Sequence, residues 1–585
     1  MVHTNARYNI RMRSSQRGVT LLDTLVGTSL MLVVFMGISA AFRLSVDVIT
    51  TNKARAGGIA LANERIEYLR SLPYTQLGTS GGVPAGALAQ TESITLNGVP
   101  YTRRTLIQYA DDPRDGSGAA DTNSITADYK IGRIDVSWES RSGVRHITIA
   151  SRFSPIGIET AVPGGTLVIS AVNAAGATIS GAQVRVVNAS TSPAIDTTTF
   201  TNASGTVTII GAPASANYQI TVSDSGYSTA QTYSTTPQNT NPSPANLTVT
   251  EAHTTNGTFA IDILCSATVR TWTPIQGSTW EDTLADASKT ATTSSTEISG
   301  GELRLAGSAP YPLAGDMQSI ALGPSRLAQW TMLSWDANTP PGTSARISLY
   351  NSTGSALIPD AQLPGNSTGF TTSPIDLSGI STSTYALVRV GIHLETADDT
   401  VSPSITSYRV DSRYGPTPLP NITFGVRGNK TIGSGPSGTL YKYDQSFSSG
   451  VAAGYTVPSL EWDTYTISVG GATGYDISSS CPAQPQSLAP GASLITDIHL
   501  LPHTTHSLLV HLRSGTTSAP IAYADITLSR TGFSTTTQTD ACGHAFFSDL
   551  VSSSAYSVSA SSTGYTTTAA STTVSGTSAT ELLFN

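Results

Sequence analysis

The stretch Arg17-Gly18-Val19-Thr20-Leu21-Leu22-Asp23 opens a mostly apolar run that continues to Phe42. A secretory signal peptide has its small-residue cleavage site after the apolar region, so that the region is removed. Here the small residue Gly18 precedes the apolar region and follows a basic leader, so cleavage after it leaves the hydrophobic segment on the mature chain. Asp23 lies inside this segment and indicates a partner, because an ionisable group in a membrane is costly.

This order of leader, glycine and acidic residue resembles the class III signal of type IV prepilins and pseudopilins. The resemblance implies that a prepilin peptidase cleaves after Gly18 and methylates the new N-terminus at Val19. It also implies that Asp23 pairs with the N-terminus of a neighbouring pilin subunit during assembly. The family usually has Phe and Glu where this chain has Val19 and Asp23. A simple signal anchor with Asp23 near the cytoplasmic boundary is the alternative.

The apolar run is long enough to span a membrane. Residues 19–42 comprise 24 mostly apolar positions, which suffice to cross about 30 Å of hydrocarbon. The arginines of the leader predict that residues 1–18 face the cytoplasm and that the bulk of the chain is exported. We therefore expect a single-pass membrane protein at a pilus or the cell surface.

The helix is expected to continue beyond the membrane. Ile59, Ala62, Ile66 and Leu69 recur at three- to four-residue spacing and form one apolar face. Pro73 ends this pattern. A helix from residue 19 to residue 72 would be roughly 80 Å long.

Two strand pairs follow the helix. The segments 93–96 and 99–109 flank Asn97-Gly98, a dipeptide that favours a type I′ hairpin. The segments 131–138 and 144–153 form the second pair. One long helix with about four strands predicts a pilin-like unit over residues 19–155. Arg103, Arg104, Arg141 and Arg145 of this unit are expected on a solvated face, and a local basic patch is the alternative.

An acidic loop separates the two hairpins. Asp111, Asp112, Asp115 and Asp121 surround a glycine turn, and calcium prefers such oxygen ligands. The EF-hand pattern is not met, because Pro113 occupies its third position. Some pseudopilins carry calcium in this region, and the resemblance therefore favours Ca²⁺; a solvated acidic turn is the alternative.

After Pro155 the chain is rich in Ser, Thr, Gly and Ala, with short alternating segments typical of β-sandwiches. An internal repeat divides it: Gly205, Tyr218 and Gly226 have the same spacing as Gly543, Tyr556 and Gly564, namely 13 and then 8 residues. A degenerate third copy surrounds Tyr465. The pattern resembles the carboxypeptidase regulatory-like, transthyretin-like sandwich, in which the Thr-x-x-x-Gly turn and the tyrosine strand are structural. The expected domains cover residues 164–252, 418–501 and 503–585.

Residues 266–415 lack this repeat and hold four of the six tryptophans. Their strand-like segments predict a jelly-roll-like sandwich that resembles carbohydrate-binding domains. Trp280, Glu281 and Asp282 form the candidate glycan site, and burial of the tryptophans in the core is the alternative. The overall prediction is a mainly β fold: a pilin helix with a small sheet, tandem sandwiches and one jelly roll.

Cysteines and histidines are further candidate site residues. Three cysteines in an exported chain allow one disulfide, and Cys481 with Cys542 is a plausible pair across neighbouring domains. His499, His503, His506 and His511 lie close in sequence, and polar residues at a domain joint explain them better than a metal site. No nucleophile elbow, zinc-protease, P-loop or Rossmann motif is present, so no enzymatic activity is expected.

The net charge of −8 lacks the basic footprint of a nucleic-acid receptor. We therefore interpret the chain as a large modular minor pilin or pseudopilin that presents β domains for adhesion to a surface glycan or protein ligand. The first alternative is a pseudopilin of a type II-like secretion or DNA-uptake system. The second is a signal-anchored surface protein that binds carbohydrate.

Overall fold

The computed structural model describes residues 20–112, 114, 125–141, 143–157, 161–562, 565 and 568–584. Gly18, Val19, Asp115 and Asp121 lie outside the described residues, as does the side chain of Asp23. The chain divides into two compact units. The first runs to Ser225 and includes Thr229–Pro237 and Asn241–Ile261; the second holds Gly226–Ser228, Gln238–Thr240 and Asp262–Asn585.

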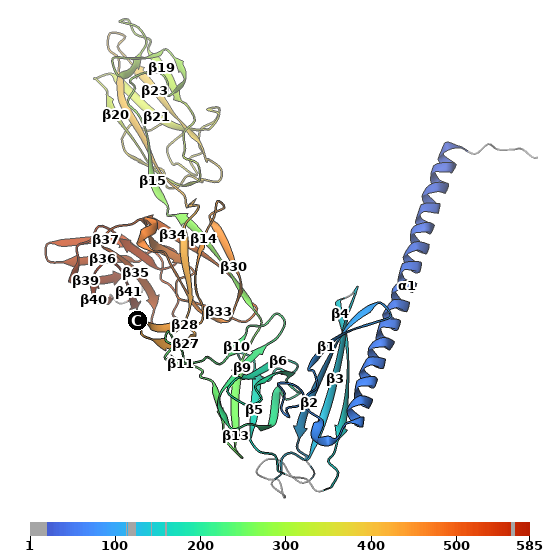
Figure 1. The fold of residues 1–585 in the computed structure, drawn as a ribbon. Helices are drawn as coiled ribbons and strands as arrows, with labels where there is room; N and C mark the ends of the chain where they lie inside the picture. Colours follow the sequence, from blue (N-terminus) through green and yellow to red (C-terminus); the bar gives the residue numbers. More distant parts are fainter. Residues whose placement is uncertain are drawn as a thin grey trace, which may run out of the picture. The chain divides into compact units, whose positions relative to one another are not determined.

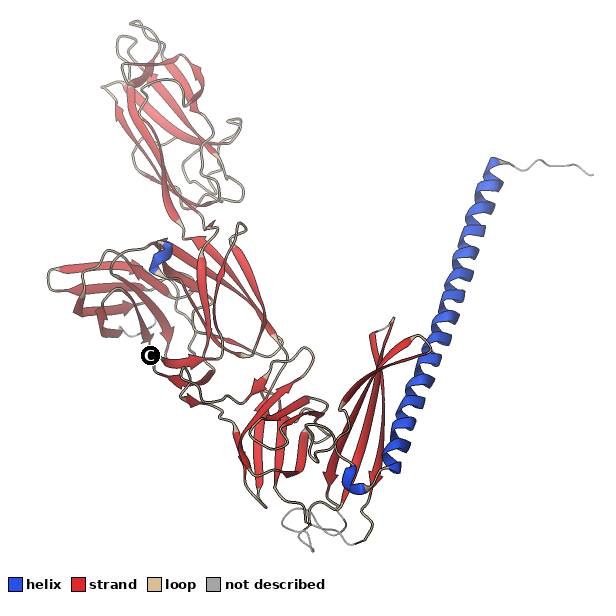
Figure 2. Cartoon of the chain, in the orientation of Figure 1, coloured by secondary structure: helices blue, strands red, loops and turns tan. Residues whose placement is uncertain are grey.

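The regular structure of the described residues is almost entirely β, with one long helix and two single-turn 3-10 segments (Figure 2). This confirms the predicted fold class. The helix α1 covers Leu21–Ser71, within two residues of the predicted bounds. It ends before Pro73, and the 3-10 turn η1 (Tyr74–Gln76) follows.

A four-stranded antiparallel sheet, here called the head, packs against the second half of α1 (Figure 1). Its strands pair in chain order: β1 (Thr91–Leu96), β2 (Val99–Ala110), β3 (Tyr129–Ser140) and β4 (Gly143–Phe153). Asn97 and Gly98 have φ values of 53° and 78°, as the type I′ turn requires. Both predicted hairpins are therefore confirmed.

The first unit also contains the first sandwich, built from two sheets. One sheet has the order β10-β9-β6-β7, with β12 also pairing with β9, and the other has the order β13-β5-β8. The strands are β5 (Gly165–Val172), β6 (Gln183–Asn188), β7 (Ile195–Phe200), β8 (Thr206–Ala212), β9 (Ser215–Ser223), β10 (Ala230–Gln231), β12 (Leu247–Val249) and β13 (Thr254–Ala260). The short strand β11 (Asn241–Pro242) belongs to neither sheet. The last strand lies beyond residue 252, where the sequence pattern placed the end of this domain.

The second unit contains a sandwich whose sequence is interrupted, here called the split sandwich. Its sheets have the orders β25-β14-β34-β32, with β30 also pairing with β14, and β29-β26-β31-β33. The strands are β14 (Cys265–Thr273), β25 (Thr417–Pro418), β26 (Thr423–Gly428), β29 (Asp444–Ser448), β30 (Gly454–Leu460), β31 (Asp463–Ser468), β32 (Tyr475–Cys481), β33 (Gln486–Leu488) and β34 (Ser493–Pro502). The hairpin β27 (Thr431–Gly435) and β28 (Gly438–Tyr441) and the 3-10 turn η3 (Gly471–Thr473) complete it.

The jelly roll is inserted into this sandwich between β14 and β25. Its sheets have the orders β17-β18-β24-β20-β22, with β15 also pairing with β24, and β16-β19-β23-β21. The strands are β15 (Gln276–Asp282), β16 (Thr290–Ser294), β17 (Thr296–Ser299), β18 (Glu302–Leu305), β19 (Ala314–Ser319), β20 (Leu327–Asn338), β21 (Thr343–Asn351), β22 (Ile375–Asp376), β23 (Val388–Thr396) and β24 (Ser404–Tyr414). Residues 266–273, which the sequence pattern assigned to the jelly roll, belong to the split sandwich. Cys265 and Val269 are in its hydrophobic core.

The C-terminal sandwich has sheets of order β38-β35-β41 and β37-β36-β39-β40. Its strands are β35 (Ser507–Ser514), β36 (Asp525–Arg530), β37 (Phe533–Gln538), β38 (His544–Phe547), β39 (Ser553–Ser561), β40 (Thr568–Val574) and β41 (Thr577–Phe584). Its core is contiguous and includes Leu508, Val510, Ile526 and Phe584.

The three sandwiches share one topological signature, a first strand that pairs in parallel with the last. These pairs are β5 with β13, β14 with β34, and β35 with β41. In the split sandwich, the jelly roll separates β14 from the rest of its domain in the sequence. The repeat centred on Tyr465 looks degenerate because Ala453 replaces the turn glycine: its carbonyl accepts the Thr271 amide, as those of Gly205 and Gly543 accept the amides of Ala171 and Leu512.

Each sandwich also has a buried tyrosine whose hydroxyl donates to a backbone carbonyl four or five residues upstream. The acceptors are Pro213 O for Tyr218 at 2.7 Å, Glu461 O for Tyr465 at 2.8 Å and Val551 O for Tyr556 at 3.1 Å. Such a bond satisfies a polar group that burial would otherwise leave without water. The repeated tyrosine therefore holds the same corner in all three copies.

Candidate functional site

The first half of α1 is apolar and exposed. Leu25 is 61% exposed, Phe35 59% and Phe42 70%. Among the described residues, one helix is long and apolar enough to cross a membrane: Thr24–Ser71, whose most apolar window has a mean hydropathy of 2.1 and no buried residues. An exposed apolar surface of this extent requires lipid or other protein to cover it.

The head packs on the second half of α1. Ala62, Ile66 and Leu69 are buried as predicted, whereas Ile59 is 39% exposed and Leu61 is buried instead. The buried face thus already includes Ala54 and Gly58, and it passes beside Ile59 on the helix surface.

Two helix glycines allow the sheet to approach closely. A Cβ at Gly57 would lie 2.5 Å from the Tyr101 hydroxyl, and a Cβ at Gly58 would lie 2.9 Å from the Trp138 ring. The Tyr101 hydroxyl donates to Ala54 O at 2.8 Å. The pair Gly57-Gly58 was missed in the sequence, although a glycine pair inside a helical pattern indicates close packing.

A charged network also connects α1 to the head. The Arg103 guanidinium contacts Glu64 at 3.1 Å, Glu92 at 3.1 Å and Leu61 O at 3.2 Å. Arg65 contacts the same Glu92 at 3.4 Å, and burial lowers the pKa of Arg65. Arg103 is only 6% exposed, so the expectation that it lies on a solvated face is wrong. Its charge can be buried because two carboxylates compensate it, that of Glu64 on the helix and that of Glu92 on β1.

Lys130 ties the 3-10 turn to the head. Its Nζ donates to Tyr74 O at 2.9 Å and Leu77 O at 2.7 Å. Burial lowers the pKa of Lys130 to about 8. These bonds fix the chain where it leaves α1 for the sheet.

The predicted calcium residues are only partly described. Asp112 forms an ion pair with Arg152 at 3.2 Å, and its Oδ1 accepts the Arg114 amide at 3.2 Å. Within the described residues, no group of three or more His, Cys, Asp or Glu side chains could hold a metal. Asp115 and Asp121 lie outside those residues, so calcium binding stays a prediction.

The candidate glycan residues do not converge. Trp280 packs on Tyr408 at a ring distance of 5.6 Å, and Asp282, 3% exposed, accepts the Tyr408 hydroxyl at 3.0 Å. Glu281 points to the opposite, exposed face of the strand. Trp330 and Trp335 are buried at 1% and 7% exposure, so both serve as core residues.

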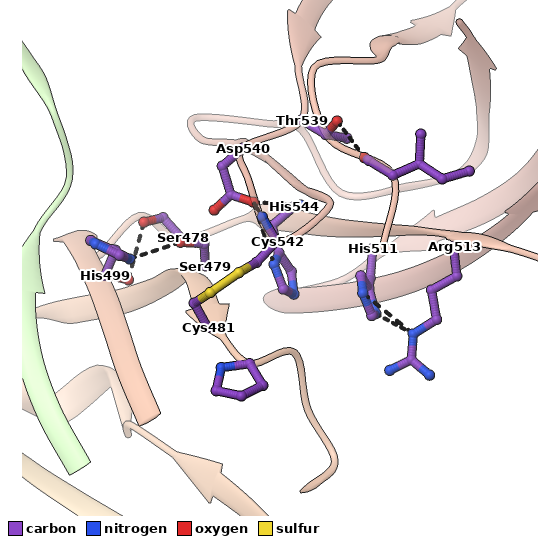
Figure 3. A network of polar contacts seen from close by, with 12 residues as sticks. Ser478, Ser479, Cys481, His499, His511, Arg513, Thr539, Asp540, Cys542 and His544 are labelled. Carbon is purple, nitrogen blue, oxygen red and sulfur yellow. Dashed lines mark hydrogen bonds and ion pairs between the residues drawn. A yellow bond between two sulfur atoms is a disulfide. The ribbon is translucent and has the colours of Figure 1, made fainter. Parts of the chain in front are cut away.

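Cys481 and Cys542 form a disulfide with a Cα–Cα distance of 5.6 Å, the pair named from the sequence (Figure 3). Cys481 is the last residue of β32 in the split sandwich, and Cys542 lies in the turn before β38. At the other end of β32, Asp476 accepts hydrogen bonds from the Thr504 amide at 3.2 Å and from the Thr577 hydroxyl at 3.1 Å. Strand β32 is therefore attached to the C-terminal sandwich at both ends.

Polar residues surround the disulfide (Figure 3). Asp540 Oδ1 accepts the amides of Cys542 and His544, both at 2.9 Å. The rings of His511 and His544 stack at 4.5 Å. Burial of His511, together with its electrostatic interactions with His544 and Arg513, lowers its pKa to about 3.

The four histidines noted in the sequence do not gather in one place. His499 contacts Ser479 at 3.0 Å, His503 contacts Asp476 at 2.7 Å, and His511 stacks on His544 instead. No sequence pattern groups His544 with them, because it lies far from the other four along the chain. Only the pairing of β35 with β38 brings it to His511.

Comparison with known proteins gives a family for one end of the chain. Residues 508–585 match the family model of the carboxypeptidase regulatory-like domain. The C-terminal sandwich therefore resembles that family, as the repeat indicated. This match covers a small part of the chain. No curated protein matches the chain.

Similar solved structures include the TIE protein of Bacillus anthracis, with 9% identity over 85% of this chain and 73% of that one, at a TM-score of 0.15. BcpA, the major pilin subunit of Bacillus cereus, has 9% identity over 72% of this chain and 99% of its own, at 0.12. The major pilin SpaD of Corynebacterium diphtheriae has 8% identity over 72% and 98%, at 0.12. Similarity at these TM-scores carries no argument about function.

Proposed function

We propose that this chain is a minor pilin or pseudopilin-like subunit that is inserted through α1 and displays its sandwiches and jelly roll outside the cell. The observation that carries the proposal is the division of α1 into an exposed apolar half and a half that is packed under the head. A continuous helix with these two halves suits a subunit that is first held in a membrane and then packed among other helices.

The sequence of the leader supports this proposal. The order Arg17-Gly18 and then Asp23 places the processing site before the apolar segment, as in prepilins. Prepilin peptidase and neighbouring pilin subunits are therefore the proposed partners. The bulk of the β domains favours a tip or initiating position, because such a body is hard to repeat along a thin filament.

Separation of sheared surface fibres from membranes tests the assembly step. The wild-type chain is expected in both fractions, and Asp23→Ala is expected to remain in the membrane fraction, because the charge that pairs with the neighbouring N-terminus is absent. Asp23→Glu restores the usual family residue and should be assembled. Asp47→Ala, on the same helix and half-buried, is the matched control and should behave as wild type.

A wild-type chain that never enters the fibre fraction would contradict the proposal. It would favour the signal-anchored surface protein instead. If Asp23→Ala and the wild type were assembled equally, Asp23 would have no role in assembly.

A further inference from the structure

Strand β37 forms one edge of the larger sheet of the C-terminal sandwich, whose order is β37-β36-β39-β40 (Figure 1). An edge strand presents a row of unpaired backbone N–H and C=O groups, with which a strand of another chain can pair. Natural sheets protect such edges with charges, prolines or bulges. Strand β37 instead holds Thr535, Thr536 and Thr537 in succession and contains no charged residue or proline. Its pairing with β36 runs without a register shift, so this edge lacks the usual protection.

The hydrogen bonds at the end of β37 show which backbone groups face the open edge. The Thr539 amide donates to Ala524 O at 2.9 Å, and Thr539 O accepts the Tyr523 amide at 3.0 Å. In an antiparallel pair, residues whose backbone groups face the partner strand alternate with residues whose groups face away from it. Because Thr539 faces the partner strand, the N–H and C=O groups of Ser534 and Thr536 face the open edge.

Strand β7 is the equivalent edge of the first sandwich, and the head covers it. The Asp196 amide donates to Gly81 O at 2.9 Å, and Asp196 O accepts the Gln90 side-chain amide at 2.7 Å. Thr198 O accepts the Arg104 guanidinium at 3.2 Å. The backbone groups on the outer side of β7 therefore have partners from a neighbouring segment of the chain.

The same positions of β37 are uncovered. Ser534 and Thr536 lie five and three residues before the turn threonine, as Asp196 and Thr198 do in the first sandwich. Within the part of the chain that the structure describes, no segment outside the sheet forms a hydrogen bond with the backbone of Ser534 or Thr536. Both side chains are exposed, and the charge of Asp196 has no counterpart in β37. The C-terminal sandwich thus leaves open an edge that the first sandwich closes.

We propose that β37 pairs in antiparallel fashion with β37 of a second copy of this chain, around a twofold axis at Thr536. In a twofold interface each residue has a fixed counterpart: Thr536 faces Thr536 across the axis, and Ser534 faces Gln538. These residues have outward backbone groups, so each facing pair can exchange two hydrogen bonds. The two sheets then become one continuous sheet. The inference does not rest on the proposed function, because α1 takes no part in it.

The side chains of β37 suit a second copy of the same strand. Thr536 and Thr527 already form a cross-strand pair within the chain, with their hydroxyl oxygens 2.8 Å apart, and such threonine pairs stabilise sheets. A twofold axis at Thr536 continues this row of hydroxyls into the second chain. Because β37 has no charge, the two copies do not repel each other, and a charged segment of another protein finds no opposite charge on the strand. The exposed side chains of Ser534, Thr536 and Gln538 are polar, so they offer no apolar surface to a hydrophobic segment.

Cysteine crosslinking of the full chain in cell membranes tests the pairing. Thr536→Cys is compared with Ser571→Cys, an exposed position on β40 at the opposite edge of the same sheet. Directly opposed residues lie about 5.5 Å apart between Cα atoms, a separation that a disulfide can bridge. Under mild oxidation, Thr536→Cys is expected to form a disulfide-linked dimer about tenfold faster than Ser571→Cys. The native cysteines do not compete, because Cys265 is buried and the other two are bonded to each other.

Exchange of charge at Thr536 tests the position of the axis. In sedimentation of the full chain in detergent micelles, the wild type is expected to be a dimer. Thr536→Lys and Thr536→Glu should each be monomeric, because like charges directly opposite each other destabilise a strand pair. An equimolar mixture of the two variants should restore the dimer, which also shows that both variants are folded. Ser571→Lys is the matched control and should remain a dimer.

Several results would overturn the inference. A monomeric wild-type chain, or a dimer that persists in both Thr536→Lys and Thr536→Glu, would exclude pairing through this edge. A mixture of the two variants that stays monomeric would exclude the axis at Thr536, and equal crosslinking of Thr536→Cys and Ser571→Cys would exclude the opposed cysteines. Crosslinking of Thr536→Cys to a different protein in place of a second copy would assign the edge to that protein.

Discussion

The first sandwich and the C-terminal sandwich form the same turn, but the residues between its threonine and its glycine differ. Thr201 and Thr539 are equivalent: each hydroxyl accepts an amide at 3.0 Å, from Ala182 and Ala524, and donates to a carbonyl. Gly205 and Gly543, with φ of 72° and 78°, also correspond. The fold therefore depends on the threonine and the glycine of the turn.

The residues between them are free to differ. Asn202 in the first sandwich accepts two amides, from Ser204 and Thr206, and Asp540 accepts the two equivalent amides of Cys542 and His544. Where the first sandwich pairs Ser170 with Thr206, the C-terminal one pairs His511 with His544. The same turn can therefore contain a disulfide-bonded cysteine without a change in its backbone.

The largest expected effect concerns the crosslink. Cys481→Ser removes a disulfide that closes a loop with a sequence separation of 61, and the chain-entropy model predicts a loss of about 4 kcal/mol. The free energy of unfolding of the C-terminal sandwich, measured in urea, should fall accordingly. Ser204→Ala at the equivalent turn of the first sandwich is the control, with a loss below ~0.5 kcal/mol. An unchanged unfolding midpoint for Cys481→Ser would contradict the role of the disulfide.

The turn glycines should come next. In Gly543→Ala the new Cβ would lie 2.6 Å from Leu512 O, and in Gly205→Ala it would lie 2.7 Å from the Thr178 Cβ. Each variant should lose about 2 kcal/mol or more, because strain at a positive φ and the clash add together. Gly176 has a φ of 82° with open space around it, so Gly176→Ala should lose only about 1 kcal/mol. Equal losses in all three variants would show that backbone conformation alone matters.

Removing the hydroxyl of the buried tyrosine should destabilise the two sandwiches to different extents. Tyr218 makes one hydrogen bond through its hydroxyl, to Pro213 O. The Tyr556 hydroxyl donates to Val551 O and accepts from Val551 N at 3.2 Å and from Arg530 at 3.1 Å. Tyr556→Phe is therefore expected to cost about 2 kcal/mol and Tyr218→Phe about 1 kcal/mol. The reverse order in denaturant unfolding would contradict this assignment.

Replacing His511 and Asp540 should have the smallest effect on stability at neutral pH, because their contribution changes only on acidification. Burial alone would raise the pKa of Asp540, but hydrogen bonds from His544 and Ser479 outweigh burial and lower that pKa to about 2. Because both folded pKa values are depressed, the stability contributed by His511 is lost as pH falls from about 6.5 towards about 3. That of Asp540 is lost from about 4 towards about 2.

Thermal unfolding between pH 7 and pH 3 measures this dependence. The melting temperature of the C-terminal sandwich should fall with pH in the wild type and fall less in a His511→Gln, Asp540→Asn double variant. The first sandwich has Ser170 and Asn202 at these positions and should show no such contribution. An identical pH profile for the double variant and the wild type would contradict the assignment.

The sequence predicted those features that depend on local patterns. The helix, both head hairpins, the recurrence of the sandwich tyrosine and the fold class follow from apolar periodicity and turn residues. The split sandwich was predicted only in part, over residues 418–501, because β14 is separated from its sheet by the inserted jelly roll and carries no Gly-Tyr mark. The burial of Arg103 was likewise missed, because Glu64 and Glu92 meet it only after the sheet packs on the helix.

Site residues were predicted less completely than the fold. Trp280, Glu281 and Asp282 are neighbours in sequence, but successive side chains of a strand point to opposite faces, so they could not form one surface. On the same sheet, Gly277, Gln329 and Arg413 lie side by side although they come from β15, β20 and β24. Only the register of the sheet shows that they meet.

The proposed function is tested most directly by the mass of the mature protein. Intact-mass and N-terminal analysis is made on the chain purified from membranes of cells with and without prepilin peptidase. The account predicts a chain that starts at N-methylated Val19 and is absent without the peptidase. An uncut leader in both strains would contradict it and leave a signal-anchored surface protein.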